Sequence, residues 1–435
     1  MDSAPLLRSL FDAAVTAADP HDATRAALVD RLAGRTDDGR GWIIAVGKAS
    51  ARMAEAARLA AADAALELAG GVIVGPEPVS ADAPLESIVG DHPIPGARSR
   101  RAAQRIGALT QAVLPDDHVL LLISGGTSSL IAAPADGVDG HALDEAFHTL
   151  LGAGGAVDIT VMNAIRRRFL RWGGGRFAAA VMPARVYQVI LSDVVGDDPA
   201  VIASGPATPD PLTARELRAL LEVHGLAARL PAVLISHLEG VIAGHEAETP
   251  KPGDTAFDNV RAPVIIGRTR LHDGMTQAAR ARGVPCTIHE AAVVGEARER
   301  GNAIARWLAT EASPGIHCWS GETTVTLGDA TGRGGRSQEL ALSAALALDA
   351  LGDAGARVTL LAAGTDGRDG PTDAAGAIVD GGTAAAIRAA GIDPAVSLAG
   401  HDAYPALDAA GALVRTGATG TNVADVVVAV LWPRQ

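Results

Sequence analysis

The chain has 435 residues and a formal net charge of −13, from 37 Lys and Arg against 50 Asp and Glu. An acidic balance of this size argues against general binding to nucleic acids or anionic membranes, which needs a dominant basic surface. The length suggests two or three domains, each able to bury its own core. We therefore expect small-molecule partners, with any anionic ligand held by positive charge concentrated at the site.

Cysteine content and hydropathy narrow the class further. Only Cys286 and Cys318 are present, too few and too far apart in sequence to suggest a disulfide scaffold or a zinc knuckle. The amino terminus lacks a basic segment followed by a long apolar core, and no apolar stretch reaches the ~18 residues of a membrane span. The sequence predicts a soluble cytoplasmic protein, either a monomer or a homodimer.

The first half of the chain alternates short apolar runs with helical patterns. A strand at 42–46 is followed by a turn at 47–48 and a helix at 49–65. Continuous apolar strands separated by helices are typical of a parallel sheet covered on both faces. The other predicted strands of this half cover 71–74, 85–89, 118–123 and 186–191.

A polar, turn-rich segment at 243–259 is the expected boundary between domains. The strands predicted beyond it cover 263–267, 285–289, 316–319, 358–363 and 426–431, with helices between them. We see no solenoid period and no heptad array. The pattern predicts two α/β lobes, one over residues 1–245 and a smaller one over 260–435.

Two turns of the first lobe have the context of an anion site. Ligands of open α/β sheets bind beyond the carboxyl ends of strands, where helix N–H groups favour anions. Gly47 and Lys48 stand there, so the Lys48 ammonium can reach such an anion; a surface lysine snorkelling at a helix end is the alternative. The turn at 124–129 offers two glycines and several hydroxyls, and the alternative is a tight turn with a serine helix cap.

Standard nucleotide-binding fingerprints are absent from the sequence. No G-x-x-x-x-G-K-[ST] occurs anywhere, and no G-x-G-x-x-G follows a predicted strand. The glycines at 152–155 do not complete the second pattern. A P-loop kinase and a standard dinucleotide fold are therefore both disfavoured.

Arginines gather in two places. One is a predicted helix on which Asn163, Arg167 and Arg171 share a face, although a run of charge is usually a solvated face. The other is a glycine-rich turn that carries Arg333 and Arg336 at the start of a helix. The planar fork of arginine suits a carboxylate or phosphate, so both stretches are candidate anion ligands.

Acidic clusters follow two predicted strands. One, at 192–198, contains Asp193, and the other, at 365–373, contains Asp366. Carboxylates beside phosphate-binding turns can hold Mg²⁺ or act as a general base, whereas Asx turns and helix caps are the alternative. No calcium-loop spacing or H-E-x-x-H occurs, and we expect His92 to pack in a turn. Together these turns, arginines and carboxylates are typical of phosphoryl transfer.

At this point the sequence resembles the glycerate 2-kinases that carry a carboxy-terminal MOFRL domain. The matching segments occur in order and extend over nearly the whole chain. They are 47–49, 90–93, 124–126, 192–198, 202–206, 248–254, 320–324, 332–339, 364–377 and 416–423.

The resemblance implies ATP- and Mg²⁺-dependent phosphorylation of the 2-hydroxyl of D-glycerate, in a cleft between a Rossmann-like lobe and a smaller α/β lobe whose MOFRL region is about 316–425. It implies that Lys48 and Arg336 face that cleft, and we add Asp193 to them as catalytic residues. Asp193 and Asp366 are the predicted metal ligands. The predicted nucleotide-binding residues are Gly47, Ser124, Gly125, Gly126, Thr127, Ser128, Gly321, Glu322, Arg333 and Thr365.

The chain departs from the family pattern in places. Gly173 stands where these kinases have the lysine of K-G-G, and Arg168 replaces a histidine of the same helix. The segment at 401–404 replaces N-D-S-Y. Two other functions stay open: a hydroxypyruvate reductase, the family's older label, which the absent dinucleotide fingerprint argues against, and a non-catalytic ligand-sensing α/β protein.

Overall fold

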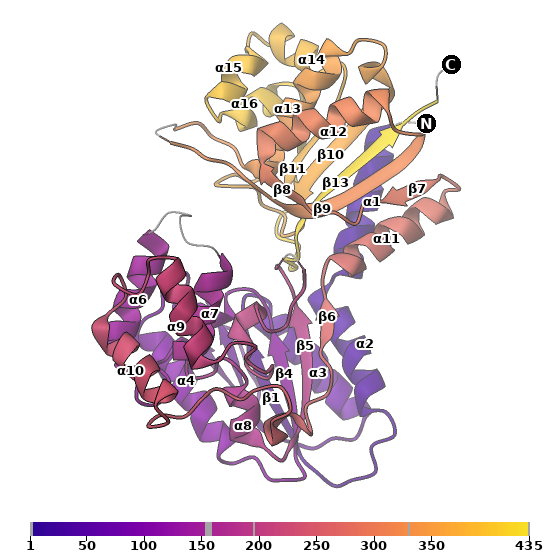
Figure 1. Ribbon diagram of the computed structural model, residues 1–435. Coiled ribbons are helices and arrows are strands. Elements are labelled where there is room, and N and C mark those ends of the chain that lie inside the picture. The colour runs from indigo at the N-terminus through magenta and orange to yellow at the C-terminus, as the bar shows by residue number, and fades with distance from the viewer. Residues whose placement is uncertain (1–2, 153–158, 195, 329–330, 434–435) are drawn as a thin grey trace. The chain divides into compact units, whose positions relative to one another are not determined.

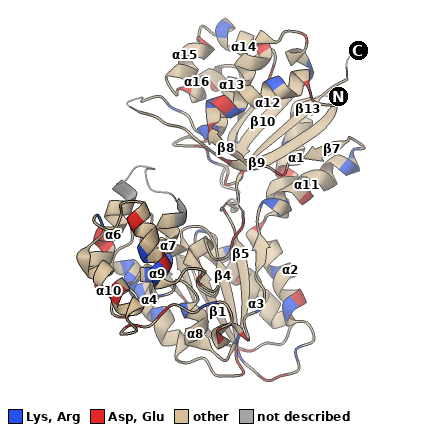
Figure 2. Cartoon of the chain, in the orientation of Figure 1, with Lys and Arg blue, Asp and Glu red and all other residues tan. Residues whose placement is uncertain are grey.

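The computed structural model describes residues 3–152, 159–194, 196–328 and 331–433 (Figure 1). The chain divides into two compact units, one formed by residues 20–265 and the other by residues 1–19 together with 266–435. Each unit has its own sheet and hydrophobic core. Charged residues lie mostly on helices and loops, while the strands carry few of them (Figure 2).

The unit of residues 20–265 is built on a six-stranded sheet. Its central strand β1 (Gly41–Val46) is parallel to β2 (Leu68–Gly75) on one side and β4 (His118–Ile123) on the other. The sheet continues through β2 to β3 (Leu85–Val89), and through β4 to β5 (Arg185–Leu191) and β6 (Val264–Ile266). All residues of β1 and β4 are buried, as the continuous apolar runs predicted.

Helices cover this sheet and form a second cluster beside it. One core cluster joins the sheet to helices such as α4, and another is formed by apolar faces of α6, α7, α9 and α10. The helices of this unit are α2 (Pro20–Leu32), α3 (Ser50–Asp63), α4 (Ala97–Thr110), α5 (Thr127–Leu130), α6 (Gly140–Gly152), α7 (Ile159–Phe169), α8 (Arg176–Val181), α9 (Ala214–Val223) and α10 (Ala232–Ile242), with 3₁₀ turns at Ile202–Ser204 and Thr255–Phe257.

The other unit has a mixed sheet of seven strands. β13 (Asp425–Leu431) lies between β10 (Val358–Gly364) and β9 (Gly315–Thr324) and is antiparallel to both. The parallel sheet expected for the first lobe is thus confirmed, whereas the sheet of this unit is mixed, because its last strand runs antiparallel through the middle. The remaining strands are β7 (Cys286–Ile288), β8 (Val293–Glu296), β11 (Gly376–Asp380) and β12 (Leu413–Val414).

Alternate residues of β9 and β13 face different helices. Trp319 and Val427 belong to a core with α12 (Ala297–Thr310) and α13 (Arg336–Ala350). The Ser320 hydroxyl accepts from Arg268 Nε (2.8 Å) and lies 2.8 Å from His272 Nε2, both residues of α11 (Arg268–Ala281). The other helices of this unit are α1 (Ser3–Ala17), α14 (Thr383–Ala389), α15 (Pro394–Ala399) and α16 (Ala403–Ala409), with a 3₁₀ turn at Gly355–Arg357.

The division differs from the expected lobes of 1–245 and 260–435 at the amino terminus. Helix α1 packs with the second unit, where a Cβ on Gly274 of α11 would lie 2.5 Å from the carbonyl oxygen of Ala13. The Thr421 hydroxyl donates to the carbonyl of Ala18 (2.8 Å). The apolar face of α1 is thus buried by residues more than 250 positions away, which no local pattern reveals.

Strand pairing also brings the two cysteines together. Cys286 of β7 and Cys318 of β9 lie on adjacent parallel strands, with 3.8 Å between their sulfur atoms. Both are free thiols. Their separation in sequence gave no sign of this proximity.

Candidate active site

The turns after β1 and β4 lock together at the carboxyl ends of these neighbouring strands. Gly47 has a φ of +127°, and a Cβ there would lie 2.1 Å from the Ser124 hydroxyl, so only glycine fits. The backbone N–H of Lys48 donates to the carbonyl of Gly125 (3.0 Å), and that of Ala49 donates to the Ser124 hydroxyl (3.1 Å). The two predicted anion-binding turns therefore form one structure.

Lys48 projects from this structure into solvent. Its side chain is exposed, and its ammonium group makes no hydrogen bond or ion pair with another residue of the described chain. His92 packs against the same turn, since a Cβ on Gly126 would lie 3.0 Å from His92 Cδ2. Burial, and then the positive charge of Lys48, lower the pKa of His92. The structure thus adds His92, expected to be a packing residue, to the surroundings of Lys48.

Lysine is much rarer than arginine in this sequence. Of 37 basic residues only Lys48 and Lys251 are lysines, and the others are arginines. Lys251 is half-buried and donates to the Thr249 hydroxyl (2.7 Å) and to a backbone carbonyl. The Lys48 amine is therefore the side-chain amine of the described residues that is left available to a ligand.

The hydroxyls of the 124–128 turn are mostly committed to the turn itself. Thr127 is buried and donates to the carbonyls of Val46 (2.9 Å) and Ser124 (2.7 Å). Ser128 lies 3.1 Å from the hydroxyl of Ser204. Thr127 and Ser124 therefore hold the turn, while Gly125, Gly126 and Ser128 stay candidates for contact with a phosphate.

Ser204 stands out for its backbone. It and Ala203 adopt positive φ values of 64° and 54°, which cost a non-glycine residue of the order of 1–3 kcal/mol and occur preferentially at functional sites. Ser204 is buried and faces Ser128 across the 3.1 Å contact. Sequence reasoning placed no role on Ser204, because positive φ at a serine leaves no sequence signal.

Asp193 follows the next strand of the sheet. It lies two residues beyond the end of β5, is half-buried, and β5 is the neighbour of β4. The carboxyl ends of β1, β4 and β5 share one side of the sheet, since the three strands are parallel. The predicted residues Lys48, Ser124 and Asp193 thus come from adjacent strand ends.

The basic helix does not supply ligands in the way its charge suggested. Arg168 is completely buried, and its guanidinium pairs with Glu248 and, at 3.6 Å, with Asp210. Arg167 pairs with Asp210 at 3.3 Å. Because both side chains already have buried counterions, the hypothesis that this helix binds the ligand anion is not supported for them.

Arg176 closes the end of the same helix. It donates to the carbonyls of Arg167 (3.0 Å) and Arg168 (2.9 Å), the free acceptors at the carboxyl end of α7. Burial lowers the pKa of Arg176 to about 10. Gly173, where the resembled kinase pattern has a lysine, packs its Cα against this end: a Cβ there would lie 2.7 Å from the Arg167 carbonyl oxygen.

In the second unit, Arg336 begins α13 and is held by two carboxylates. Its Nε donates to Asp425 Oδ2 (2.5 Å), its Nη2 to Asp425 Oδ1 (3.1 Å), and its Nη1 to Glu322. Burial would lower the pKa of Arg336, but the bonds to Asp425 and the charge of Glu322 raise it. A guanidinium has five N–H donors, so two remain for a ligand.

The amino end of α13 is already occupied by the carboxyl group of Asp369. Asp369 accepts from the backbone N–H groups of Ser337 (3.1 Å) and Gln338 (2.7 Å). A Cβ on Gly335 would lie 2.3 Å from this carboxyl group. The N–H groups of Ser337 and Gln338 are therefore not available to a ligand anion beside Arg336.

The arginine of the preceding turn has a different environment. The guanidinium of Arg333 stacks 4.1 Å from the ring of Tyr404, and its backbone N–H donates to Asp402 (2.8 Å). A Cβ on Gly332 would lie 2.2 Å from the carbonyl oxygen of Gly400. Gly400 and the segment at 401–404, which differs from the N-D-S-Y of the resembled kinases, thus position the turn that carries both arginines.

Thr365 and Asp366, which follow β10, have different environments. Thr365 is buried, donates to the carbonyl of Ala424 (2.7 Å) and accepts from the N–H of Val423 (3.2 Å), so its hydroxyl holds the backbone rather than a ligand. Asp366 is exposed. A Cβ on Gly364 would lie 3.2 Å from an Asp366 oxygen and 3.3 Å from an Asp425 oxygen, so both carboxylates border the same point.

Glycine at 321 serves the packing of strands. A Cβ there would lie 2.3 Å from the carbonyl oxygen of Val293 on β8. Gly321 therefore lets β8 and β9 approach, while the neighbouring Glu322 reaches Arg336.

The donor chemistry of both units suits Mg²⁺. Asp193, Asp366 and Asp425 offer carboxylate oxygens, the ligands that this ion prefers, and Mg²⁺ often binds through one or two carboxylates with substrate phosphates. Within the described residues, neither Asp193 nor Asp366 belongs to a group of three or more closely spaced protein ligand atoms. Asp193 in the first unit, and Asp366 with Asp425 in the second, are therefore separate candidates for contact with such an ion.

Two protein families match most of the described chain. Residues 6–239 match a domain of unknown function, DUF4147, and residues 315–425 match the MOFRL family. No helix of the described residues is long and apolar enough to cross a membrane.

Relatives and a solved structure cover nearly the whole chain. A protein of Agrobacterium vitis with the provisional name hydroxypyruvate reductase is 38% identical, with 97% of this chain and 93% of that protein covered. D-glycerate 2-kinase of Thermotoga maritima is 37% identical, with 89% of this chain and 90% of that protein covered. A crystal structure of Thermotoga maritima glycerate kinase aligns with a TM-score of 0.85, 35% identity, and 98% and 99% of the two chains covered. The chain belongs to the glycerate kinase family in which a DUF4147 domain is combined with a MOFRL domain.

Proposed function

We propose that this protein is a D-glycerate 2-kinase that transfers the γ-phosphoryl group of ATP to the 2-hydroxyl of D-glycerate, giving 2-phospho-D-glycerate and ADP. The observation that carries the proposal is the 37% identity to a D-glycerate 2-kinase over nine-tenths of both chains. The exposed, unpaired amine of Lys48 beside a glycine-rich turn supports it, because phosphoryl transfer depends on positioned positive charge.

Lys48 is the proposed electrostatic catalyst. Its ammonium is not neutralised by a described carboxylate, so its full charge is available to the oxygens of a phosphoryl group. The backbone contacts of Gly47 and Ser124 hold the turn from which it projects. Gly125, Gly126 and Ser128 are the proposed contacts of the nucleotide phosphates.

Arg336 is the proposed anion ligand of the second unit. Asp425 and Glu322 fix the plane of its guanidinium, and the two remaining N–H donors can bind a carboxylate or a phosphate oxygen. Arg333 stacks on Tyr404 and supports the same turn. Asp193 and Asp366 are the proposed holders of Mg²⁺, which when bound would neutralise charge on the phosphate oxygens.

The proposal is tested by measuring the products of the purified protein with ATP, Mg²⁺ and D-glycerate. Phosphorus NMR should show 2-phosphoglycerate together with an equal amount of ADP. A parallel assay with NADH or NADPH and hydroxypyruvate should show no loss of nicotinamide absorbance. Oxidation of the nicotinamide without ADP release would instead establish a reductase, and ATP binding without turnover would establish a sensor.

The two lysines make the role of Lys48 directly testable. An amine-reactive acyl phosphate of ATP should acylate Lys48 and spare Lys251, whose amine is hydrogen-bonded to Thr249. Peptide mass spectrometry identifies the modified lysine, and ATP should protect it. Labelling at Lys251 alone would remove Lys48 from the proposed nucleotide site.

A further inference from the structure

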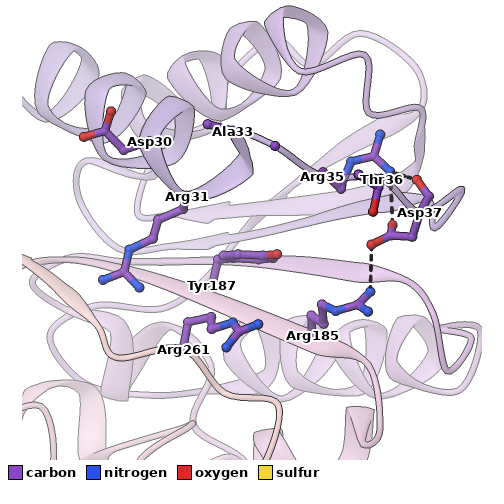
Figure 3. Close-up of a pocket in the computed structure, with 10 residues that line it drawn as sticks. Asp30, Arg31, Ala33, Arg35, Thr36, Asp37, Arg185, Tyr187 and Arg261 are labelled. Carbon is purple, nitrogen blue, oxygen red and sulfur yellow. Dashed lines mark hydrogen bonds and ion pairs between the residues drawn. The ribbon is translucent and has the colours of Figure 1, made fainter.

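A polar cavity lies at the amino-terminal end of β5, whereas the candidate active site lies at the carboxyl ends of the strands. Its volume is about 430 Å³, and it is formed by the end of α2, the loop at 33–37, the start of β5, and Arg261 (Figure 3). Arg185 is the first residue of β5, whereas Asp193 follows its last residue. Because a strand rises about 3.3 Å per residue, the cavity is roughly 20 Å from the candidate active site along this strand.

Three arginines of this cavity have few partners. Figure 3 shows Arg31, Arg185 and Arg261 around Tyr187. Only Arg185 is paired, through one Nη1 contact with Asp37 (3.1 Å). The side chains of Arg31 and Arg261 make no hydrogen bond or ion pair within the described part of the chain. Guanidinium groups therefore exceed the carboxylates that neutralise them.

The carboxylate of Asp37 is shared among several donors. It contacts His118 Nε2 (2.6 Å), Arg35 Nη1 (3.2 Å) and Arg185 Nη1 (3.1 Å). Burial would raise the pKa of Asp37, but the hydrogen bonds of His118 and Arg35 lower it to about 2. Asp37 thus holds Arg185 in place without neutralising Arg31 or Arg261.

The remaining groups of the cavity do not offset this excess of guanidinium groups over carboxylates. Asp30 lies in an exposed position at the end of α2. Arg35 is already bound to Asp37 and, at 3.1 Å, to the carbonyl of Ala65. Tyr187 is buried, and its hydroxyl lies 3.3 Å from His118 Nδ1, so it forms a fixed wall.

We propose that this cavity is a binding site for a small phosphorylated acid, held by Arg31, Arg185 and Arg261. The forked donors of arginine suit a phosphate or a carboxylate, and three of them suit a ligand with at least two negative charges. The net charge of −13 and the limited volume disfavour a nucleic acid. The proposal is independent of the proposed kinase activity, because it uses none of the residues assigned to it.

The test is calorimetric titration of inorganic pyrophosphate into the full-length protein at low ionic strength. The double variant Arg31→Ala/Arg261→Ala should bind pyrophosphate at this site at least about tenfold more weakly, since charge-assisted hydrogen bonds are lost. Arg229→Ala is the matched control, because Arg229 is exposed and lies in the same unit away from the cavity. That control should bind as the wild type does.

Two further measurements keep the assignment specific. Lys48→Ala should leave this binding unchanged, whereas its loss in Lys48→Ala would assign the pyrophosphate to the candidate active site and overturn the proposal. Arg261→Lys keeps the charge but not the fork and should give an intermediate affinity. Absence of binding in the wild type, or equal binding in the double variant with unchanged melting temperature, would also overturn it.

Discussion

Arg336 is bound to Asp425 by two parallel hydrogen bonds, Nε to Oδ2 at 2.5 Å and Nη2 to Oδ1 at 3.1 Å. The two residues join the start of α13 to the start of β13, 89 positions apart in sequence. A guanidinium held in this way has a fixed plane, and its remaining donors are aimed before any ligand arrives. Such preorganisation is what transition-state stabilisation requires.

Arg336→Lys should therefore reduce activity although the charge is kept. Lysine cannot form the two parallel bonds with Asp425, so the position of the cation is lost. We expect kcat to fall by about 10²-fold or more, and KM to rise, because positioning and binding are lost together. Steady-state kinetics with ATP and D-glycerate measure both effects.

Arg333→Lys is the internal control for this change. Arg333 lies on the same turn but is exposed and stacks on Tyr404, so its replacement should leave kcat within a few-fold of the wild type. Wild-type kinetics for Arg336→Lys would show that the second unit does not bind the reacting anions through this residue. Melting temperatures of both variants separate lost folding from lost catalysis.

Lys48→Ala should lower kcat by about 10²–10³-fold, the usual cost of removing one positioned electrostatic contact. The melting temperature should stay unchanged, because the Lys48 amine has no partner among the described residues. Lys251→Ala is the opposite case: it removes bonds to Thr249 and Leu212 and should destabilise the fold while folded molecules keep their activity. Near-normal kcat in folded Lys48→Ala would exclude Lys48 from catalysis.

Arg168→Met should destabilise the protein by about 1–3 kcal/mol, because the buried carboxylate of Asp210 and the partly exposed Glu248 lose one hydrogen-bonded cation. Arg167 and Lys251 remain beside Asp210, so its charge stays partly compensated. Arg171→Met is the matched control, since Arg171 is partly exposed and lies 3.8 Å from a fully exposed Asp136. Such a surface pair contributes about 0–1 kcal/mol. Urea unfolding measures both, and a loss below 1 kcal/mol for Arg168→Met would contradict a structural role.

The central strands could be predicted from the sequence because buried strands of a parallel sheet are continuous apolar runs. Residues 42–46 and 118–123 predict β1 and β4, and the glycines after them predict turns. The joining of Lys48 to the 124–126 turn then follows from the strand order. By contrast, no local pattern predicts that β13 runs antiparallel or that α1 packs with the second unit.

The site could be predicted only as far as its local turns. Charge on a helix does not disclose its counterions, so the internal pairing of Arg168 with Glu248, 80 positions later, could not be foreseen. The same holds for Asp369, whose carboxyl group accepts from two N–H groups at the start of α13 and so removes them from a ligand. Long-range pairing decides which polar groups remain for substrate.

Asp366→Asn and Asp193→Asn should each raise the Mg²⁺ concentration needed for half-maximal activity, by about tenfold or more. An amide keeps the size of the side chain and loses the negative charge that a divalent cation requires. Asp198→Asn is a control from the same acidic cluster, because Asp198 accepts from the N–H of Ala200 in its own turn. Unchanged Mg²⁺ dependence in both variants would show that neither aspartate is a ligand.

Asp369 should make stability depend on pH in an identifiable direction. Burial raises the pKa of Asp369 from 3.8 to about 7, against the opposing effect of the Gln338 and Ser337 N–H groups. The unfolded chain therefore releases this proton near pH 4, while the folded protein keeps it to near pH 7. Its contribution to stability is complete below pH 4 and is lost as the pH rises through 7.

The variant Asp369→Asn isolates this contribution, because asparagine does not titrate. The melting temperature of the wild type minus that of the variant should be largest near pH 4.5 and should shrink up to pH 8. The variant should be less stable overall at low pH, since its amide places an NH2 donor where a carboxyl oxygen of Asp369 now accepts from a backbone N–H group. Other carboxyl groups, such as Asp37 with its pKa near 2, are common to both proteins and cancel in the difference. A difference that stays constant from pH 4.5 to 8 would show that Asp369 is ionised throughout this range in the folded protein, as the carboxylate capping α13.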